Sequence, residues 1–496
     1  MQKKKLTLVI VSLLVVVLSV SLAYFTAQII GKGKDVSVTS ANLQIVFTDS
    51  DGALTETDIE PGWSATKTFT IKNDTKTEYK YNIVIKDLLN TFVTEGYLQY
   101  KITSTNDGYN MTEFKDIPKS SVATDTILAY SVVIPNGVTQ SYTIEFKYAN
   151  DESVDQSEDM GKKLSGTLFI TEGTEDPNKT LYNQLLVNKS TKLTRTSFSS
   201  VLTTDNTKTL YTSTENGTTV YYFAGNATDN WVKFGKNESN QDLYWRIIRT
   251  NSDGSVKLLY HGTSTTATDA YIGESAFNSS YNNIASVSYM YGSLGGIPNA
   301  RENTTNSTIK TIIDNWYKDN LNTNYGKYLS TTAVYCNDRS TSDNANFGAY
   351  TRLITNKTPS YDCAATEDKF TVDTSTGNGK LTYPIALMTA DEVSFAGGVM
   401  YTNASTWYYY NSAKGSSTGS TWWWLLSPEF WYDSGAYVSQ VFGSDHPGYL
   451  DYRRVGDARD SSGVRPAVSL KSCVKTSGGN GSASDPYTIK ETETGC

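Results

Sequence analysis

Histidine is nearly absent from this chain of 496 residues, which contains only His261 and His446. General bases, nucleophile-activating pairs and zinc sites usually draw on histidine. A hydrolase or metalloenzyme would therefore have to be built from carboxylates alone, and we expect no catalytic residue, no metal site and no cofactor. His261 ends a predicted strand and is expected to be structural, whereas His446 lies in a Gly/Pro turn and is a candidate surface contact.

Charge is also scarce, because charged residues make up 19% of the chain and the formal net charge is −8. No broad basic surface is available, which excludes nucleic acid and anionic lipid as partners. The chain instead has 35 Tyr and many short alternating runs, a composition typical of an extracellular, β-rich protein. At about 150 residues per domain, the length predicts roughly three units.

The N-terminal segment 6–30 carries no charge and follows three consecutive lysines at 3–5. Ser21-Leu22-Ala23 places small residues where signal peptidase requires them, which predicts a cleaved signal peptide and a mature chain that begins at Tyr24. As a helix, the same segment would span about 38 Å, so an uncleaved membrane anchor is the alternative. Either way we expect a secreted or cell-surface protein that meets the membrane only through this segment.

Four cysteines in an exported chain suggest two disulfides, and the sequence alone allows three connectivities. We favour Cys336 with Cys363 and Cys473 with Cys496. Each pair closes a short loop and would contribute about 3 kcal/mol in the chain-entropy model. The first would also hold the stretch 331–380, which the sequence presents as a mostly polar insertion.

Residues 36–172 alternate between apolar and polar side chains in short runs bounded by turn residues. The pattern predicts strands at 43–47, 66–72, 79–86, 97–102, 127–134, 140–148 and 164–170. Seven such strands favour a β-sandwich. The polar, Gly- and Pro-containing stretch 173–178 is expected to be a linker.

The motifs SLAYFTA, ANLQIVFTD, IEPGWSATKTFTIKND and YKYNIVI resemble the TasA/camelysin class of exported matrix proteins. The resemblance implies a jelly-roll-like sandwich, residence at the surface or in the matrix, and fibre formation. Camelysins are described as proteases, but this domain contains no histidine and no His-Glu-x-x-His motif, so that activity is not carried over. We hypothesise self-assembly in which the strand-like segment 36–47 pairs with the open sheet edge of a neighbour.

Residues 179–475 are expected to form one further unit, followed by a polar C-terminal tail at 476–496. The runs 243–249 and 255–260 predict a hairpin, because a turn sequence at 251–254 joins them. Ser307 is a candidate cap for a helix that reaches Leu321. Thr389 and Glu392 form a predicted capping box for a second helix, which Gly397 would end.

The stretch 421–470 carries the candidate binding residues. Trp422, Trp423 and Trp424 predict a buried strand that ends at Ser427-Pro428, and Trp423 and Val468 are expected in the core. Large side chains then occupy the predicted connections and short strands, where small polar residues are usual. The candidate ligand-binding residues are Trp431, Tyr432, Asp433, Tyr437, Ser439, His446, Tyr449, Asp451, Tyr452, Arg453 and Arg454, and we expect Trp431, Tyr432, Tyr449 and Arg453 on connections.

The series DLYWRIIRTNSDGSVKLL, IDNWYKDNL, LMTADEVSFAGGV, WWWLLSP and GVRPAVSLK resembles an uncharacterised domain of exported proteins from gram-positive gut bacteria. The order of these motifs along the chain resembles that in the formylglycine-generating-enzyme branch of the C-type lectin fold. This resemblance implies two helices on a small antiparallel sheet, with ligands met by the last loops and strands. The calcium-binding motifs of C-type lectins do not occur here, and the cysteine pair of the oxidase could come only from Cys473 and Cys496.

The sequence therefore predicts a mainly β protein, with a jelly-roll-like β-sandwich followed by an α+β domain similar to the C-type lectins. The predicted function is that of a cell-surface or matrix-displayed binding protein, with an extracellular protein or glycan as its ligand. One alternative is a structural matrix component without a specific ligand. The other is an oxidase of the formylglycine-generating type.

Overall fold

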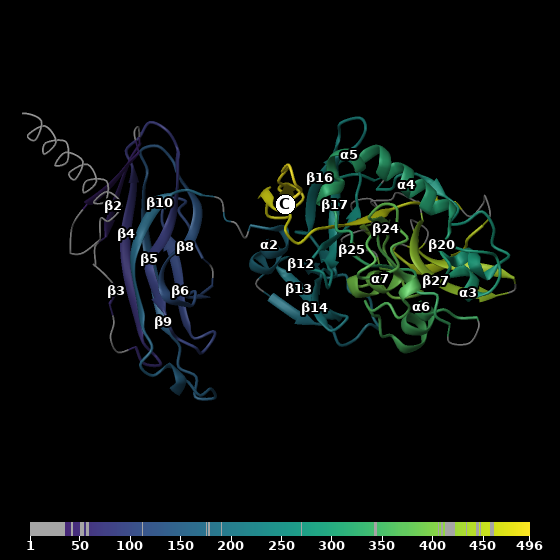
Figure 1. Cartoon of the computed structure of the whole chain (residues 1–496), viewed down its shortest axis with the longest axis horizontal. Helices are drawn as coiled ribbons and strands as arrows, with labels where there is room; N and C mark the ends of the chain where they lie inside the picture. Colours follow the sequence, from purple (N-terminus) through teal and green to yellow (C-terminus); the bar gives the residue numbers. More distant parts are fainter. Residues whose placement is uncertain are drawn as a thin grey trace, which may run out of the picture. The chain divides into compact units, whose positions relative to one another are not determined.

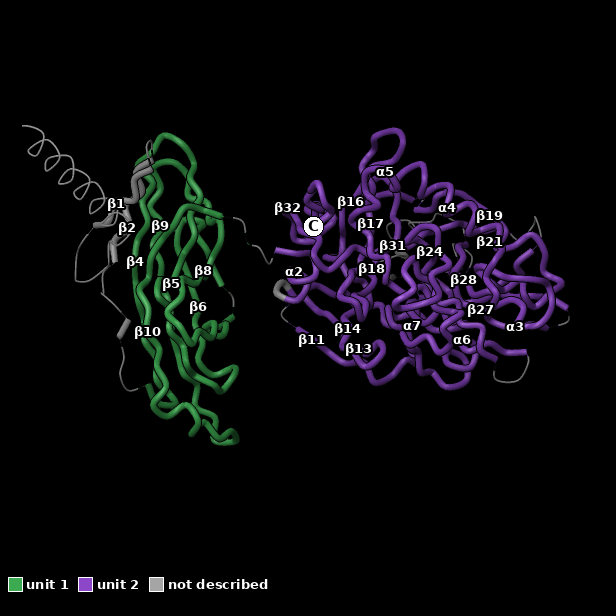
Figure 2. Tube along the Cα trace, viewed as in Figure 1, with its two compact units in different colours: residues 1–177 green, residues 178–496 purple. Residues whose placement is uncertain are grey.

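Two compact units make up the chain, Met1–Pro177 and Asn178–Cys496, and strands dominate both (Figures 1 and 2). The computed structural model describes residues 35–40, 43–49, 54–55, 59–111, 113–174, 176, 179–189, 191–268, 270–341, 345–404, 406–407, 410–411, 422–432, 434–442, 446, 448–456 and 461–496. The predicted N-terminal signal or anchor lies outside these residues. In the described part of the chain, no helix has the length and apolarity needed to cross a membrane.

The first unit is a sandwich of two antiparallel sheets. One sheet runs β1 (Asp35–Ser40), β2 (Leu43–Asp49), β4 (Ser64–Asn73), β9 (Thr139–Tyr148), β6 (Leu98–Ser104) and β7 (Lys115–Asp116). The other runs β3 (Leu54–Thr55), β10 (Leu164–Glu172), β5 (Tyr79–Asn90) and β8 (Ser120–Ile134). Each predicted strand of this unit is present, which confirms the mainly β, sandwich-type fold.

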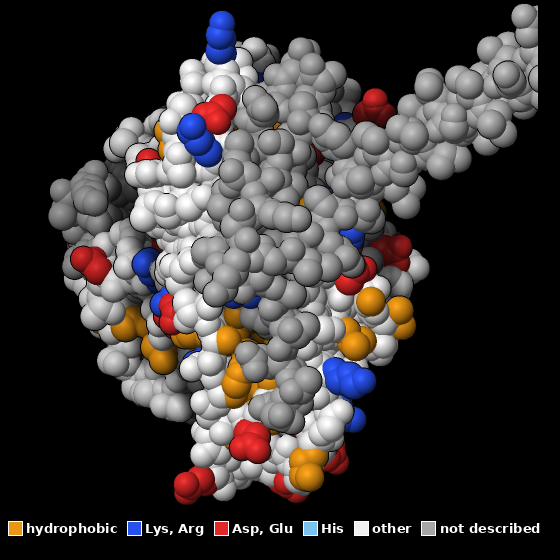
Figure 3. Space-filling model, turned by 90° about the vertical axis from the view of Figure 1, so that its left-hand side faces the viewer, with side chains coloured by type: hydrophobic (Ala, Val, Ile, Leu, Met, Phe, Trp, Pro, Cys, Tyr) orange, Lys and Arg blue, Asp and Glu red, His pale blue; other side chains and the backbone are white. Residues whose placement is uncertain are grey.

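Side-chain alternation builds the core of this sandwich. Along β9, Tyr142, Ile144 and Phe146 are buried, whereas the residues between them are partly exposed. Such alternation puts one face of a strand against the opposite sheet and the other in solvent. On the face seen in Figure 3, hydrophobic side chains form small separate patches with charged residues scattered between them.

The segment proposed for self-assembly pairs within its own chain. Strand β1 pairs with β2, with Val36 opposite Phe47, and β2 pairs in turn with β4. The segment 36–47 is therefore a hairpin at the edge of its own sheet rather than one extended strand. Exchange between copies would first have to break these backbone hydrogen bonds.

The second unit is organised around a ten-stranded sheet. Its path is β11 (Thr191–Thr194), β13 (Thr209–Glu215), β14 (Thr218–Tyr222), β17 (Asp242–Thr250), β16 (Trp231–Lys236), β33 (Tyr487–Ile489) and β32 (Thr476–Gly478), joined by β18 (Val256–Tyr260), β24 (Ile385–Leu387) and β31 (Pro466–Leu470). The predicted hairpin is β17 and β18. The prediction of a polar tail at 476–496 is wrong, because Tyr487 is fully buried on β33, which pairs with β16.

A five-stranded sheet carries the aromatic stretch. Its order is β19 (Glu274–Ser275), β30 (Ser462–Gly463), β27 (Trp423–Tyr432), β28 (Gly435–Val441) and β29 (Leu450–Arg454). The predicted strand end at Ser427-Pro428 is wrong. The register shifts on both sides of Pro428, which lies opposite Val438. A bulge of this kind accommodates a proline, so the strand continues to Tyr432.

Helices are short and begin at the predicted caps. In α4 (Thr308–Asn320), the Ser307 side chain accepts a hydrogen bond from the Lys310 backbone NH. The capping box of Thr389 and Glu392 begins α7 (Ala390–Ala396), and Gly397 follows with φ of 123°. Both predicted helix starts are therefore confirmed. A further helix, α2 (Leu181–Asn188), begins after Thr180, whose side chain accepts a hydrogen bond from the Asn183 backbone NH.

Short elements connect the sheets. They are β12 (Asp205–Asn206), β15 (Asn226–Ala227), β20 (Met290–Tyr291), β21 (Thr305–Asn306), β22 (Tyr335–Cys336), β23 (Lys369–Phe370), β25 (Thr406–Trp407), β26 (Tyr410–Asn411), α3 (Ile297–Ala300), α5 (Asn322–Tyr325), α6 (Gly348–Tyr350), the 3-10 turns η1 (Ser157–Asp159), η2 (Ile284–Val287), η3 (Gly326–Tyr328) and η5 (Thr366–Asp368), and the π-helical turn η4 (Thr351–Asn356).

The stretch 331–380 is not the loosely held polar insertion that the sequence predicts. Phe347 and Phe370 are fully buried in the core of the second unit. The favoured disulfides are present: the Cα atoms of Cys336 and Cys363 lie 5.7 Å apart, and those of Cys473 and Cys496 lie 5.3 Å apart. Two disulfides are consistent with an oxidising, extracytoplasmic compartment.

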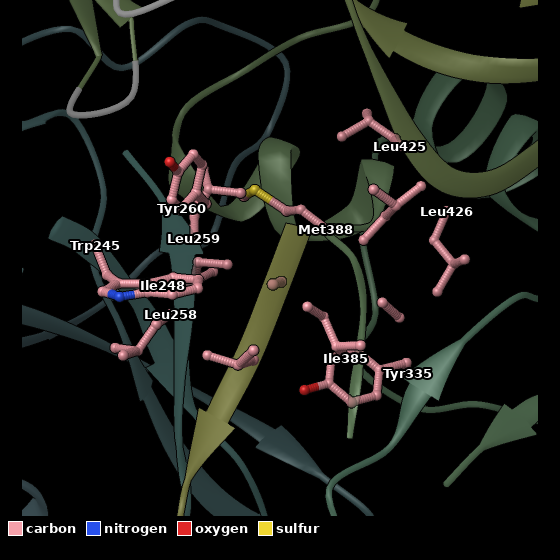
Figure 4. Close-up of a cluster of buried hydrophobic side chains, with 14 of the residues drawn as sticks. Trp245, Ile248, Leu258, Leu259, Tyr260, Tyr335, Ile385, Met388, Leu425 and Leu426 are labelled. Carbon is pink, nitrogen blue, oxygen red and sulfur yellow. The ribbon is translucent and has the colours of Figure 1, made fainter. Parts of the chain in front are cut away.

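The core of the second unit lies where its two sheets meet (Figure 4). Trp245, Leu258 and Leu259 come from the hairpin, and Leu425 and Leu426 come from β27. Trp423 and Val468 have no exposed surface, so both predicted core positions are confirmed. This shared core holds β27 against the larger sheet.

A buried carboxylate, that of Glu392, joins the hairpin of β17 and β18 to helix α7. Glu392 accepts hydrogen bonds from Arg249 Nε at 2.8 Å and Lys257 Nζ at 2.7 Å. It also accepts one from the Thr389 backbone NH at 3.0 Å. Burial alone would raise the pKa of Glu392, but the Lys257 and Arg249 cations outweigh burial and lower it to about 2. The hairpin and helix α7 are thus joined by one ionised group.

Replacing Trp423 by Ala should lower the free energy of unfolding by about 2–5 kcal/mol, because a large side chain is removed from a closed core. Tyr432 is 70% exposed, and its replacement by Ala should change stability by less than about 0.5 kcal/mol. Urea unfolding of both variants tests this. Equal destabilisation by the two substitutions would contradict the assignment of core and surface.

Glu392→Gln should destabilise the protein by about 3–5 kcal/mol at pH 7, because Lys257 and Arg249 lose a buried counter-charge. The folded pKa of Glu392, about 2, lies below its ordinary value of 4.5. The wild-type carboxylate therefore stabilises above pH 4.5, and that stability is lost as pH falls toward 2. The difference in unfolding free energy between wild type and variant should shrink between pH 5 and pH 2.5. A constant difference would contradict the assignment.

Candidate functional site

A row of partly exposed aromatic rings runs over strands β27, β28 and β29. We call this row the aromatic band, and it consists of Tyr350, Phe430, Tyr437, Tyr452, Tyr401, Tyr449, Phe442, Trp422 and His446. Each ring contacts at least one other. The band therefore forms a continuous aromatic surface rather than a set of isolated side chains.

Strand pairing brings one half of the band together. Phe430 lies opposite Tyr437 in the register of β27 and β28, and their rings stack with centroids 4.6 Å apart. Tyr452 enters from β29, with its ring centroid 4.4 Å from that of Phe430 and 5.7 Å from that of Tyr437. Both contacts with Tyr452 are edge-to-face, the arrangement that aromatic pairs prefer.

Tyr401 joins the two halves of the band from a different part of the chain. Its ring centroid lies 6.1 Å from that of Tyr452 and 6.2 Å from that of Tyr449. Its backbone has φ of 60°, a left-handed conformation that is rare for a bulky residue, and its NH bonds to the Leu450 carbonyl oxygen at 3.0 Å. A conformation of this kind costs about 1–3 kcal/mol and persists where surrounding contacts hold it. Tyr401 is nevertheless 41% exposed.

The other half of the band continues from Tyr449 to Trp422. Tyr449 lies 5.8 Å from Phe442 and 5.2 Å from His446, measured between ring centroids. Phe442 stacks on Trp422 at 3.9 Å. The guanidinium of Arg453 lies 4.5 Å from the centroid of the Trp422 ring, so this end of the band carries a cation–π contact.

A buried acid lies beside the first half of the band. Glu429 precedes Phe430 on β27 and has no exposed surface. Ser439 Oγ donates a hydrogen bond to Glu429 Oε2 at 2.5 Å, while Glu429 Oε1 has no hydrogen-bond partner among the described residues. Burial raises the pKa of Glu429 to about 8, and the charges of Asp451 and Asp391 add to the shift. Glu429 is thus mostly protonated at neutral pH.

A second acid, Asp451, lies among the tyrosines. Its Oδ1 accepts a hydrogen bond from the Tyr452 backbone NH at 2.8 Å, and burial raises the pKa of its carboxyl. Burial also raises the pKa values of Tyr401, Tyr449 and Tyr452, and the Asp451 charge raises each of them further. Asp451 therefore acts on three neighbouring hydroxyls at once.

The structure brings most of the predicted site residues together. Tyr437, Tyr449, Tyr452 and His446 belong to the band, and Ser439 supports it through Glu429. Arg454 lies with its guanidinium 4.1 Å from the centroid of the Tyr281 ring.

Other predicted site residues lie elsewhere. Trp431 is half-buried against the core, and the exposed Tyr432 ends β27. The expectation that Trp431, Tyr432 and Arg453 lie on connections is wrong, because the first two are on β27 and Arg453 is on β29. Tyr449, which immediately precedes β29, does lie on a connection. Asp433 lies outside the described residues.

Sequence reasoning missed Tyr401, Tyr350 and Glu429 as parts of this site. Tyr350 and Tyr401 are distant in sequence, and only tertiary contacts bring them to β27 and β29. The burial of Glu429 follows from the continuation of β27 past Pro428, after the fully buried run from Trp423 to Leu426.

No resident metal can be assigned from the described residues, since none of their His, Cys, Asp and Glu side chains gather in groups of three or more suited to a metal ion. The band and its two acids thus offer stacking, hydrogen bonding and negative charge. Residues in such a site can bind and orient a ligand.

Comparison with known proteins gives no family for this chain. No family model matches it, and no curated protein matches it. One solved structure, titled "AvmM Catalyzes Macrocyclization in Alchivemycin A Biosynthesis", aligns over 28% of this chain and 92% of its own, with 10% identity and a TM-score of 0.16. A likeness this low supports no inference about fold or function.

Glu429→Gln should change how stability depends on pH. The folded pKa of Glu429, about 8, lies above its ordinary value of 4.5, so between these values the unfolded chain loses a proton that the folded chain keeps. Wild-type stability should therefore fall as pH rises from 5 to 8. Glu429→Gln should lack this loss of stability between pH 5 and pH 8. Urea unfolding at several pH values measures it. The exposed Glu238→Gln serves as control, and a Glu429→Gln profile parallel to wild type would contradict the raised pKa.

Proposed function

We propose that this protein is an exported binding protein, displayed at the cell surface or in the matrix, and that its second unit contacts an extracellular protein or glycan. The observation that carries the proposal is the aromatic band. Partly exposed tyrosine, tryptophan and phenylalanine side chains serve as anchors in protein interfaces, and their faces stack on sugars.

The arrangement of the band favours binding over a purely structural role. A core would bury these rings fully, as it does Trp423 and Trp424 one strand segment away. Tyr401 instead keeps a costly backbone conformation and 41% exposure while it contacts two other tyrosines. Strain retained at a partly exposed aromatic residue suggests that the residue has a use outside the fold.

Export is supported by the sequence before the first unit and by the disulfides. The lysines at 3–5 and the uncharged segment 6–30 fit a signal peptide or an anchor. Both disulfides would form readily only in an oxidising compartment. Under this proposal the first unit is the TasA/camelysin-like part that presents the second, C-type-lectin-like unit, and it supplies any self-assembly.

The test is binding of the full mature chain to an array of extracellular glycans and proteins. Tyr401→Ala and Tyr437→Ala should each weaken binding to the partner found by at least about 2 kcal/mol, or roughly 30-fold, as aromatic anchors do. Tyr244→Ala, a half-buried tyrosine on β17 of the other sheet, should leave affinity unchanged. Tyr432→Ala tests whether the contact extends beyond the band.

Thermal melts recorded beside the titrations separate lost contacts from lost folding. Unchanged affinity in Tyr401→Ala and Tyr437→Ala would show that the band is not the contact surface. A chain that assembles into fibres but retains no partner on the array would support the structural alternative.

A further inference from the structure

Three tyrosines meet at the middle of the aromatic band, and Asp451 precedes one of them, Tyr452, on β29. Tyr401 lies between Tyr452 and Tyr449, with ring centroids 6.1 and 6.2 Å away. The planes of Tyr401 and Tyr452 cross at 86°, and those of Tyr401 and Tyr449 cross at 50°. Partly exposed rings inclined to one another in this way can present more than one face or edge to a single small group.

We propose that Tyr401, Tyr449 and Tyr452, together with Asp451, bind an organic ammonium group carried by the extracellular ligand. This inference rests on the proposed binding function and names the chemical class that the same surface recognises. Aromatic faces carry negative electrostatic potential, and a cation within about 6 Å of a ring centroid is attracted to it. A quaternary or alkylated ammonium is weakly hydrated, so it loses little on leaving water for such rings.

The charge of Asp451 favours a cation beside the three rings. Asp451 precedes Tyr452 on β29, and its Oδ1 accepts a hydrogen bond from the Tyr452 backbone NH at 2.8 Å. Beyond the effect of burial, the Asp451 charge raises the pKa values of the Tyr401, Tyr449 and Tyr452 hydroxyls. Glu429 is mostly protonated at neutral pH, so it adds hydrogen-bonding capacity rather than charge.

Other ligand classes fit the same residues less well. An anionic group would be repelled by Asp451. Although Arg453 is close to Asp451 in sequence, its guanidinium lies on the Trp422 ring, at the end of the band away from Tyr401. His446 contacts Tyr449 and Phe442, so it marks the side of the site next to Phe442. A neutral sugar could stack on one ring and donate a hydroxyl hydrogen bond to Asp451, but it carries no positive charge for Asp451 to attract.

The test compares choline with 3,3-dimethyl-1-butanol, which has the same shape and no charge. The full mature chain is titrated with each at constant ionic strength, followed by isothermal calorimetry and tyrosine fluorescence. Choline and tetramethylammonium should bind at least about tenfold more tightly than the neutral compound, because only the cations are attracted to the ring faces and to the Asp451 charge. Equal binding of choline and its neutral counterpart, or no binding of choline, would overturn the proposal.

Matched variants assign the effect to the named residues. Tyr449→Phe keeps the ring and should hold the choline affinity within about threefold, whereas Tyr449→Leu should lower it by about tenfold. Asp451→Asn should lower choline affinity by a similar factor and leave the weak binding of the neutral compound unchanged. Tyr244→Leu is the remote control. If Tyr449→Leu fails to fold, the proposal is still tested by Asp451→Asn and by the comparison of choline with 3,3-dimethyl-1-butanol on the wild-type protein.

Failure of this inference can be told apart from failure of the proposed function. If band variants lose an array partner but choline does not bind, the band is a contact surface whose ligand lacks an ammonium group. If methyl glucosides bind and choline does not, the ligand is a neutral glycan and the ammonium proposal is wrong.

Discussion

The buried ionised carboxylate of Glu392 joins the central hairpin of the second unit to the elements that carry the aromatic band. It joins Arg249 and Lys257 on the hairpin to the first turn of α7. The start of α7 also holds β27. The Ala390 NH bonds to Ser427 Oγ at 2.9 Å, and the Leu426 NH bonds to the Met388 carbonyl oxygen at 2.8 Å. The strand that carries Glu429 and Phe430 is therefore positioned by contacts that begin at Glu392.

Two glutamates of this unit, Glu392 and Glu429, are both buried, but their pKa values shift in opposite directions. Glu392 meets two cations, and its pKa falls to about 2 despite burial. Glu429 meets a serine hydroxyl and two further acids, and burial raises its pKa to about 8. Removing a carboxylate from water is costly unless a cation compensates it, so the first group ionises and the second keeps its proton. The ion pairs of Glu392 are therefore suited to hold the fold, whereas Glu429 places a neutral carboxyl beside the band.

The sequence predicted those features whose signals are local. Alternation located the strands of the sandwich, a turn sequence located the hairpin, and Thr389 with Glu392 located a helix start. The errors arose where a distant partner decides the outcome. Strand β27 passes through Pro428 because Val438 lies opposite it in a bulge, and Tyr487 is buried because β16 pairs with its strand. Tyr401 reaches the site through a backbone hydrogen bond to Leu450, for which the sequence near either residue gives no indication.

The strands that carry the aromatic band are held in place by their packing against the core. Trp423 and Trp424 on β27 are fully buried, and each ring of the band packs against at least one other. Association normally costs entropy for every side chain that must be ordered, and rigid aromatic side chains held in place reduce that cost. Such a surface can bind without rearranging. Its selectivity then depends on how well a ligand complements the carboxyl of Asp451, which lies on β29 next to Tyr452.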